Sequence, residues 1–227
     1  MCRRHRCGVA TVSEQRFRRR RGQHPLGGRR YPGRVTADTR GRVILLNGPS
    51  SSGKSSIGRA LLPLLAGPWF FVPVDAIGAM RSAVATALLD NAGVQQVLLR
   101  TRRGYHRAVA GLASAGNDVV MDYPLSEPWR LDDLLVVLDG FDVVLVDIRC
   151  SPAELERRER DRGDRPAGLA RSQTGVFAHG DRDVVVDTTT ASAEQCAARI
   201  VEALPTLTRP TAFDRLRLAR VHCTPPS

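Results

Sequence analysis

Lysine is nearly absent from the sequence. Of the 34 basic residues only Lys54 is a lysine, so the other 33 are arginines. Aromatic residues are also scarce, at 5%, while Val, Leu, Ile and Ala are plentiful, which suits a buried parallel sheet covered by helices. A single lysine among arginines indicates a position at which the two cations cannot replace each other.

The sequence also lacks the marks of a secreted or membrane-spanning protein. Neither a C-x-x-C pair nor an apolar secretion signal is present, so we expect reduced thiols and a cytoplasmic location. The apolar runs are much shorter than the ~18 residues that indicate a transmembrane helix. The five cysteines lie far apart, at Cys2, Cys7, Cys150, Cys196 and Cys223.

Charge is unevenly distributed along the chain. The formal net charge is +11, and residues 1–42 alone account for it, with 13 arginines against Glu14 and Asp38. The remaining residues hold 21 basic and 21 acidic side chains. Because the basic segment has no apolar periodicity, we expect residues 1–41 to form a disordered extension. We do not expect the rest of the chain to bind nucleic acid, and such binding is an alternative only for this extension. A natural start near Val35 is a further alternative.

Five short apolar runs alternate with helical stretches in the rest of the chain. This alternation is typical of a doubly wound parallel sheet, so we predict a five-stranded α/β domain over residues 42–204. A C-terminal tail is expected over residues 205–227. The predicted strands are 42–47, 69–75, 118–122, 142–147 and 183–187, and the predicted helices are 55–65, 76–89, 103–115, 128–138, 153–161, 168–177 and 193–204.

The segment GPSSSGKS matches the P-loop pattern G-x-x-x-x-G-K-[ST] between a predicted strand and a predicted helix. Gly48 and Gly53 let backbone N–H groups face phosphate oxygens, and the start of the helix adds the positive end of its dipole. Lys54 supplies a compact ammonium for the β- and γ-phosphates of ATP, and Ser55 supplies a hydroxyl for Mg²⁺. The expected ATP-binding residues are Gly48, Pro49, Ser50, Ser51, Ser52, Gly53, Lys54, Ser55 and Ser56.

The rest of the sequence favours a small-molecule kinase among P-loop proteins. It contains no N-K-x-D motif, which argues against a GTPase. Asp75 ends the second predicted strand, where a carboxylate would face the acceptor hydroxyl, and Asp122 ends the third, where Mg²⁺ needs a water-bridged ligand. The arginine-rich segment 154–171 is either a solvated helix with pairs such as Glu154–Arg158 or a lid over the phosphates.

Aspartate ends four of the predicted strands. Ligands of such sheets bind beyond the carboxyl ends of the strands, so one rim can carry four carboxylates. For Asp75 the alternative to a catalytic role is a helix cap, and for Asp122 the alternative is a structural turn. The four residues are Asp75, Asp122, Asp147 and Asp187.

Further segments extend the P-loop match over residues 42–203. They are VPVDAIGAM, RERDRGDRPAGLA and HGDRDVVVDTT, and together with ILLNGPSSSGKSS they resemble the chloramphenicol 3-O-phosphotransferase family. The resemblance implies a P-loop nucleoside-kinase-like fold with an arginine-rich lid, and ATP-dependent phosphorylation of an alcohol. It also implies that Asp75 is the general base and that Arg162 and Arg165 belong to the lid.

The acceptor is less well defined than the chemistry. Ala76 stands where the family commonly has a polar residue, and the segment after it does not align with the longer insertion of the antibiotic-modifying member. Chloramphenicol, with the antibiotic resistance it implies, is one candidate acceptor, and a primary metabolite or nucleotide is another. A non-enzymatic nucleotide-binding protein with a basic arm is a third alternative. His179 is interpreted as structural, with a catalytic role as its alternative.

Overall fold

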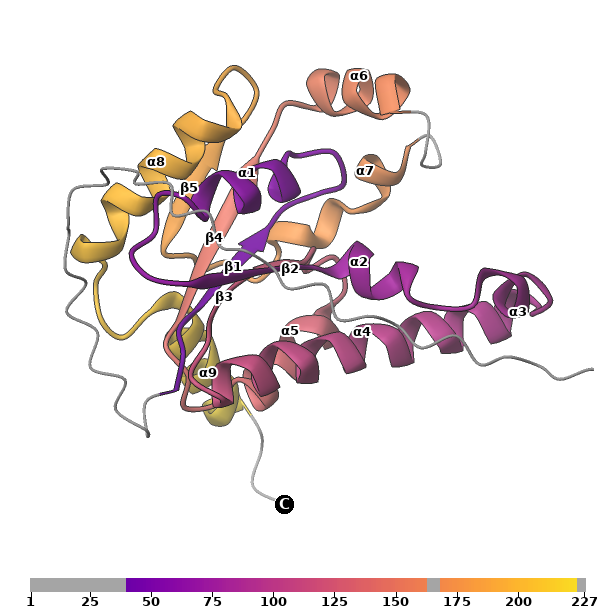
Figure 1. Cartoon of the computed structure of the whole chain (residues 1–227), viewed down its shortest axis with the longest axis horizontal. Helices are drawn as coiled ribbons and strands as arrows, with labels where there is room; N and C mark the ends of the chain where they lie inside the picture. The colour runs from indigo at the N-terminus through magenta and orange to yellow at the C-terminus, as the bar shows by residue number, and fades with distance from the viewer. Residues whose placement is uncertain (1–39, 163–167, 224–227) are drawn as a thin grey trace, which may run out of the picture. The chain divides into compact units, whose positions relative to one another are not determined.

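The computed structural model describes residues 40–162 and 168–223, apart from the side chains of Arg162, Thr174 and residues 221–223. Five parallel strands form one sheet in the order β2-β3-β1-β4-β5 (Figure 1). This confirms the predicted fold, with strand ends shifted by at most two residues. The strands are β1 (Val43–Asn47), β2 (Trp69–Pro73), β3 (Asp118–Asp122), β4 (Val143–Arg149) and β5 (Val184–Asp187).

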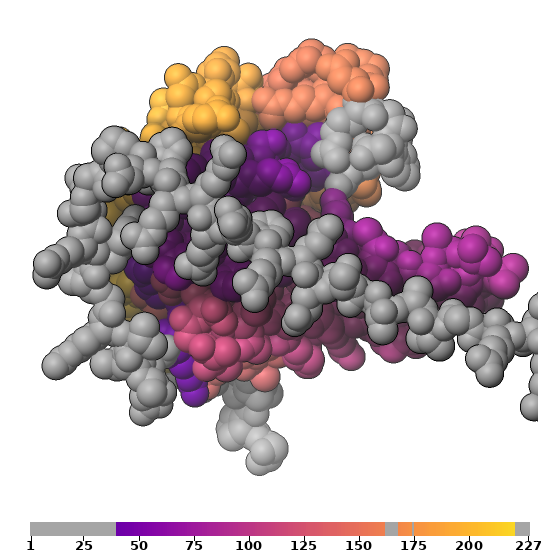
Figure 2. All heavy atoms as spheres, viewed as in Figure 1, coloured from indigo at the N-terminus to yellow at the C-terminus, as the bar shows by residue number. Residues whose placement is uncertain are grey.

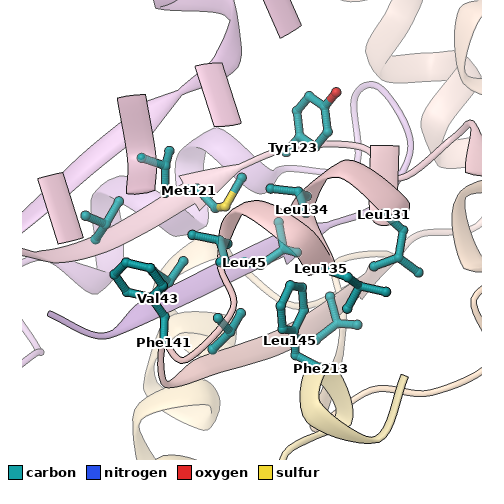
Figure 3. Close-up of a cluster of buried hydrophobic side chains, with 14 of the residues drawn as sticks. Val43, Leu45, Met121, Tyr123, Leu131, Leu134, Leu135, Phe141, Leu145 and Phe213 are labelled. Carbon is teal, nitrogen blue, oxygen red and sulfur yellow. The ribbon is translucent and has the colours of Figure 1, made fainter. Parts of the chain in front are cut away.

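The three central strands, β1, β3 and β4, are buried on both faces, because successive residues of a strand point to opposite sides and helices cover both. Val43 and Leu45 of β1 join a hydrophobic cluster on one face, part of which Figure 3 shows. Ile44 and Leu46 join a second cluster on the other face. Helices α4 (Asn91–Ser114), α5 (Pro128–Val137) and α9 (Ala212–Cys223) contribute to the first cluster, and α1 (Lys54–Leu61) and α8 (Ala193–Ala203) contribute to the second.

Residues 76–89, predicted as one helix, instead form parts of two short helices, α2 (Val74–Ala79) and α3 (Ala83–Ala87). Two caps interrupt the predicted pattern. The side chain of Ser82 accepts a hydrogen bond from the N–H of Ala85 and starts α3. Asp90 accepts one from the N–H of Gly93, at 2.8 Å, and starts α4 twelve residues before the predicted boundary.

The C-terminal segment also differs from the prediction, because residues expected to form a tail include helix α9. Ala212 and Phe213 in its first turn are fully buried in the core, and Arg215 forms an ion pair with Asp181 at 2.7 Å. Few apolar side chains of α9 reach the core, so its sequence shows little periodicity. The predicted helix 168–177 is also divided, and the remaining helices are α6 (Pro152–Arg162), α7 (Leu169–Ser172), η1 (Thr174–Phe177) and η2 (Leu204–Thr206).

Candidate active site

The P-loop joins the end of β1 to the start of α1. A Cβ atom at Gly48 would lie 2.6 Å from the carbonyl oxygen of Ile148, so only glycine fits this close approach. Gly53 has a φ of 89° and forms the N-cap of α1, a left-handed conformation that favours glycine. The backbone of the loop therefore turns tightly at both glycines, which is the geometry that a phosphate-binding loop requires.

Lys54 is the first residue of α1 and is 8% exposed. Its Nζ donates a hydrogen bond to the carbonyl oxygen of Pro49 at 2.7 Å, so the ammonium folds back over the loop. The first turn of α1, which is fully described, contains no acidic residue. The positive end of the helix dipole and the ammonium therefore act together on the same small volume.

Ser55 and Asp122, the two predicted Mg²⁺ ligands, lie side by side in the structure. The hydroxyl of Ser55 donates a short hydrogen bond to Oδ2 of Asp122. Asp122 is the last residue of β3, which pairs with β1, so the sheet itself brings the carboxylate beside the P-loop. Tyr105 supports this edge, because its hydroxyl donates to the carbonyl oxygen of Val72 at 2.7 Å. Burial raises the pKa of Tyr105 well above its usual value, so the donor stays protonated.

Asp75 occupies a different element from the one predicted. It does not end β2, which stops at Pro73, but lies exposed in the first turn of α2. Pro73 takes the N-cap position, so the alternative of Asp75 as the N-cap residue is wrong. Asp75 nevertheless lines the same cavity as Lys54 and Asp122.

Three adjoining cavities lie beyond the carboxyl ends of the strands. The P-loop cavity, of about 80 Å³, is lined by Ser50, Ser51, Gly53, Lys54, Ser55, Ser56, Val74, Asp75, Asp122, Pro124 and Gln173. The α8 cavity, of about 360 Å³, shares Ser51, Gly53 and Ser56 with it and extends to Arg158 and the start of α8. The arginine cavity, of about 400 Å³, shares Val74, Asp75, Pro124 and Gln173 with the P-loop cavity and extends to Arg81, Arg102 and Arg130.

Of the two arginines predicted for the lid, Arg165 lies outside the described residues and Arg162 ends α6 with its side chain undescribed. The structure instead brings Arg158 of α6 to the P-loop. Its guanidinium donates to the backbone and side-chain oxygens of Thr188 at 2.6 and 3.2 Å. The expected pair with Glu154 is present at 2.7 Å. Arg158 belongs to the segment 154–171 that was predicted as a solvated helix or a lid, but its own approach to Ser51 of the loop was not predicted.

The four strand-end aspartates do not form one open rim. Asp147 is fully buried within β4, and Oδ1 accepts a hydrogen bond from Asn47 at 2.8 Å. Nε2 of His179 lies 3.2 Å from the same oxygen. The residues that line the three cavities do not include Asp147, Asp187 or His179. This buried cluster agrees with the interpretation of His179 as a structural residue. Asn47 also belongs to the cluster, although no sequence motif had indicated a role for it.

The parallel sheet order and the loop between β1 and α1 define the chain as a P-loop kinase-like protein. The profile of the chloramphenicol phosphotransferase-like proteins matches residues 41–205. The chain belongs to this family, and the prediction of a phosphotransferase that acts on a small molecule is confirmed.

Relatives and solved structures agree with this assignment. A protein of Mycobacterium tuberculosis strain H37Rv, named provisionally as an O-phosphotransferase, is 29% identical over 78% of this chain and 88% of its own. The APS kinase of M. tuberculosis, solved with AMPPNP and APS, covers 74% of this chain and 99% of its own at 19% identity and a TM-score of 0.53. The shikimate kinase of Acinetobacter baumannii, solved with shikimate, covers 73% and 94% at 15% identity and a TM-score of 0.54. These structures share the fold.

Proposed function

We propose that the protein transfers the γ-phosphoryl group of ATP to a hydroxyl group of a small molecule, with Mg²⁺ as cofactor. The observation that carries the proposal is the lining of the P-loop cavity. It joins Lys54, Ser55 and Asp122 to Asp75, so that phosphate-binding groups and a carboxylate face one small volume. Phosphoryl transfer requires positioning and charge stabilisation more than covalent chemistry, and these groups supply both.

ATP fits the two adjoining cavities at the P-loop. The triphosphate would take the P-loop cavity, where N–H groups of the loop and the ammonium of Lys54 offset its negative charge. The nucleoside would take the α8 cavity, whose walls include Ile57, Ala191 and Ala193. Arg158 lines the α8 cavity, and its guanidinium donates to the carbonyl oxygen of Ser51, a residue that lines both cavities. This position suits contact with a phosphate oxygen.

Mg²⁺ fits the pair formed by Ser55 and Asp122. Their short hydrogen bond already gathers a hydroxyl and a carboxylate, the oxygen donors that Mg²⁺ prefers. Among the described residues no group of three His, Cys, Asp or Glu side chains could hold a metal ion, and Mg²⁺ commonly takes its other ligands from phosphates and water. When bound, the ion would offset charge on the transferring phosphates.

Asp75 would act as the general base. Its position on α2 lets it face both the P-loop cavity and the arginine cavity, so it can orient an acceptor hydroxyl and accept its proton. Arg162 and Arg165 remain predicted lid residues that would stabilise the moving phosphoryl group. Chloramphenicol and a role in antibiotic resistance come from the family's name alone, and a metabolite or nucleotide acceptor stays an alternative.

The surroundings in which the enzyme works are also part of the proposal. Among the described residues no helix is both long and apolar enough to cross the hydrophobic core of a membrane. The cytoplasmic location and the limited role of residues 1–41 in nucleic-acid binding stay predictions. Salt-sensitive binding to DNA or RNA that disappears without these residues would favour the non-enzymatic alternative.

An ATP-consumption screen tests the proposal directly. The purified protein is incubated with ATP, Mg²⁺ and a panel of hydroxylated metabolites and antibiotics that includes chloramphenicol, and phosphorylated products are detected by mass spectrometry. Lys54→Ala is the matched control, because no other lysine can reach the phosphates. We expect at least one product from the wild type and a loss of ATP affinity or turnover in the variant. Equal ATP affinity of the two proteins in a calorimetric titration would contradict the proposal.

A further inference from the structure

The arginine cavity collects guanidinium groups from three elements that are distant in sequence. Arg81 follows α2, Arg102 lies in α4 and Arg130 lies in α5, and all three line the cavity of about 400 Å³. Asp75 lines the same cavity and also the P-loop cavity. One end of the cavity therefore adjoins the P-loop cavity, while its other walls combine the three arginines with uncharged residues such as Leu98 and Tyr123.

Several donor atoms of these arginines are buried without a partner. Within the described residues, Nε and Nη1 of Arg81 and Nε of Arg130 have no hydrogen-bond partner, and neither has the hydroxyl of Tyr123. Arg130 is only 4% exposed and lies over the ring of Tyr123, with its Cζ 5.4 Å from the ring centroid. A buried N–H that lacks an acceptor costs free energy, so the cavity favours a ligand with several acceptor oxygens.

The carboxylates around the cavity do not balance its arginines. Glu127 interacts with Arg130, lies 3.7 Å from Arg102 and accepts a hydrogen bond from Trp129. Burial and the nearby Arg130 lower the pKa of Arg102 from its usual value, although Glu127 opposes the shift. Among the described residues that line the cavity, three are arginines and Asp75 is the one carboxylate, so even with Glu127 added the guanidiniums outnumber the carboxylates by one.

We infer that the phosphoryl acceptor is a small hydroxylated anion, which carries a carboxylate, phosphate or sulfate group. This inference rests on the proposed function and specifies its substrate class. Arg81, Arg102 and Arg130 would bind the anionic group, while the hydroxyl faces Asp75. The hydroxyl oxygen forms a bond to the γ-phosphorus as the bond to the β-phosphate oxygen breaks, so that ADP leaves and the proton passes to Asp75. A neutral acceptor with few acceptor oxygens would leave the buried N–H groups of Arg81 and Arg130 without a partner.

Anion binding can be measured without knowing the acceptor. The wild type is saturated with AMPPNP and Mg²⁺, which occupies the P-loop, and titrated with inorganic phosphate, sulfate or acetate while its melting temperature is followed. Arg81→Gln and Arg102→Gln should weaken the binding of at least one anion by about 10-fold or more. Arg100→Gln is the matched control, since Arg100 is exposed on α4 and does not line the cavity. Arg130 is left unchanged because it also donates to the carbonyl oxygen of Pro124.

Turnover then distinguishes the anionic groups from one another. Matched acceptors are compared, gluconate with glucose for a carboxylate, glucose 6-phosphate with glucose for a phosphate and glucose 6-sulfate with glucose for a sulfate, alongside chloramphenicol as a neutral compound. We expect kcat/KM to favour an anionic member by about 10-fold or more, and the two arginine variants to remove this preference.

Two results would overturn the inference while leaving the proposed function intact. One is that anions do not raise the melting temperature, or raise it equally in the wild type and in all three arginine variants. The other is phosphorylation of a neutral acceptor at the same or greater kcat/KM than that of its anionic counterpart. Failure of AMPPNP to bind would instead contradict the proposed function, and the comparison of arginine variants with Arg100→Gln would still report on the cavity.

Discussion

The two sides of the active site are built in different ways. On the ATP side, the P-loop is enclosed by backbone contacts, and Lys54 and Ser52 are almost fully buried. On the side proposed to bind the acceptor, called the acceptor side below, helices α2 and α3 are fully described and contain no buried residue. Val84 and Leu88 of this segment are 77% and 84% exposed, and Figure 2 shows its magenta surface projecting at the right-hand side.

This difference has a physical cause. A phosphate cradle needs converging N–H groups, so its shape depends on backbone sterics within a few consecutive residues. An acceptor pocket is lined by side chains from several elements, and its exposed helices tolerate substitution. The ATP side is therefore expected to be sensitive to small changes of volume, whereas the acceptor side should respond mainly to changes of charge.

The largest effect is expected from Asp75→Asn, because Asp75 lines a cavity on each of the two sides. The amide keeps the size of the carboxylate but cannot accept a proton. We expect transfer to the acceptor to fall by about 10² to 10⁴-fold, with ATP affinity nearly unchanged. Steady-state kinetics and calorimetric titration with AMPPNP measure the two effects.

Asp90→Asn is the control for this experiment, because Asp90 caps α4 and asparagine caps about as well as aspartate. This variant should keep both activity and stability. If Asp75→Asn turns over any accepted substrate at the wild-type rate, Asp75 is not the base, and Asp122 is the next carboxylate to test.

Two glycine substitutions compare the packing of the two sides. A Cβ atom at Gly58 in α1 would lie 2.2 Å from the ring of Phe71, whereas at Gly104 in α4 no described atom lies within 4 Å. Gly58→Ala should lower the free energy of unfolding by about 1–3 kcal/mol. Gly104→Ala should raise it by roughly 0.5–1 kcal/mol, because alanine favours the helix. Denaturant unfolding measures both, and equal effects would show that the two sides do not differ in packing.

Acidification should lower the free energy of unfolding through His106, which lies in α4. Burial lowers the pKa of His106 to about 4, although its 2.5 Å hydrogen bond with Asp133 opposes the shift. Between about pH 6.5, the ordinary value, and pH 4, the unfolded state binds a proton that the folded state does not. Stability therefore falls as the pH decreases through this window, by about 1–2 kcal/mol between pH 7 and pH 5.

The substitution His106→Gln isolates this contribution. The amide can still donate to Asp133 but does not titrate, so the free energy of unfolding should depend less on pH than in the wild type. Denaturant unfolding of both proteins at pH 7 and pH 5 measures the difference. Identical changes in the two proteins would assign the pH dependence to other groups.

The smallest expected effect is that of removing residues 1–40. The removed segment carries most of the net positive charge and none of the site motifs. A chain that begins at Gly41 should keep the kcat/KM of the full chain at physiological ionic strength, where long-range charge effects are screened. If this shorter chain folds but loses activity, the predicted domain boundary is wrong.

The sequence by itself determined the elements whose causes are local. Apolar runs located all five strands within two residues, because strands of a parallel sheet covered by helices are continuous apolar runs in sequence. The P-loop could be predicted from its motif, since Gly53 and Lys54 meet constraints of the loop itself. The close approach of Gly48 to Ile148 of β4 is a tertiary contact, which the motif indicated without its cause. The pairing of Ser55 with Asp122 also followed from order along the chain, because adjacent parallel strands end at the same edge.

Only the tertiary structure decided what depends on distant elements. It replaced one predicted helix by α2 and α3, moved Asp75 from a strand end to α2, and packed α9 where a tail was expected. It also brought Arg81, Arg102 and Arg130 to one cavity with Asp75, the proposed general base. Each arginine taken alone is an ordinary member of an arginine-rich chain. Their convergence is set by how α4 and α5 pack on the sheet, which no local pattern records.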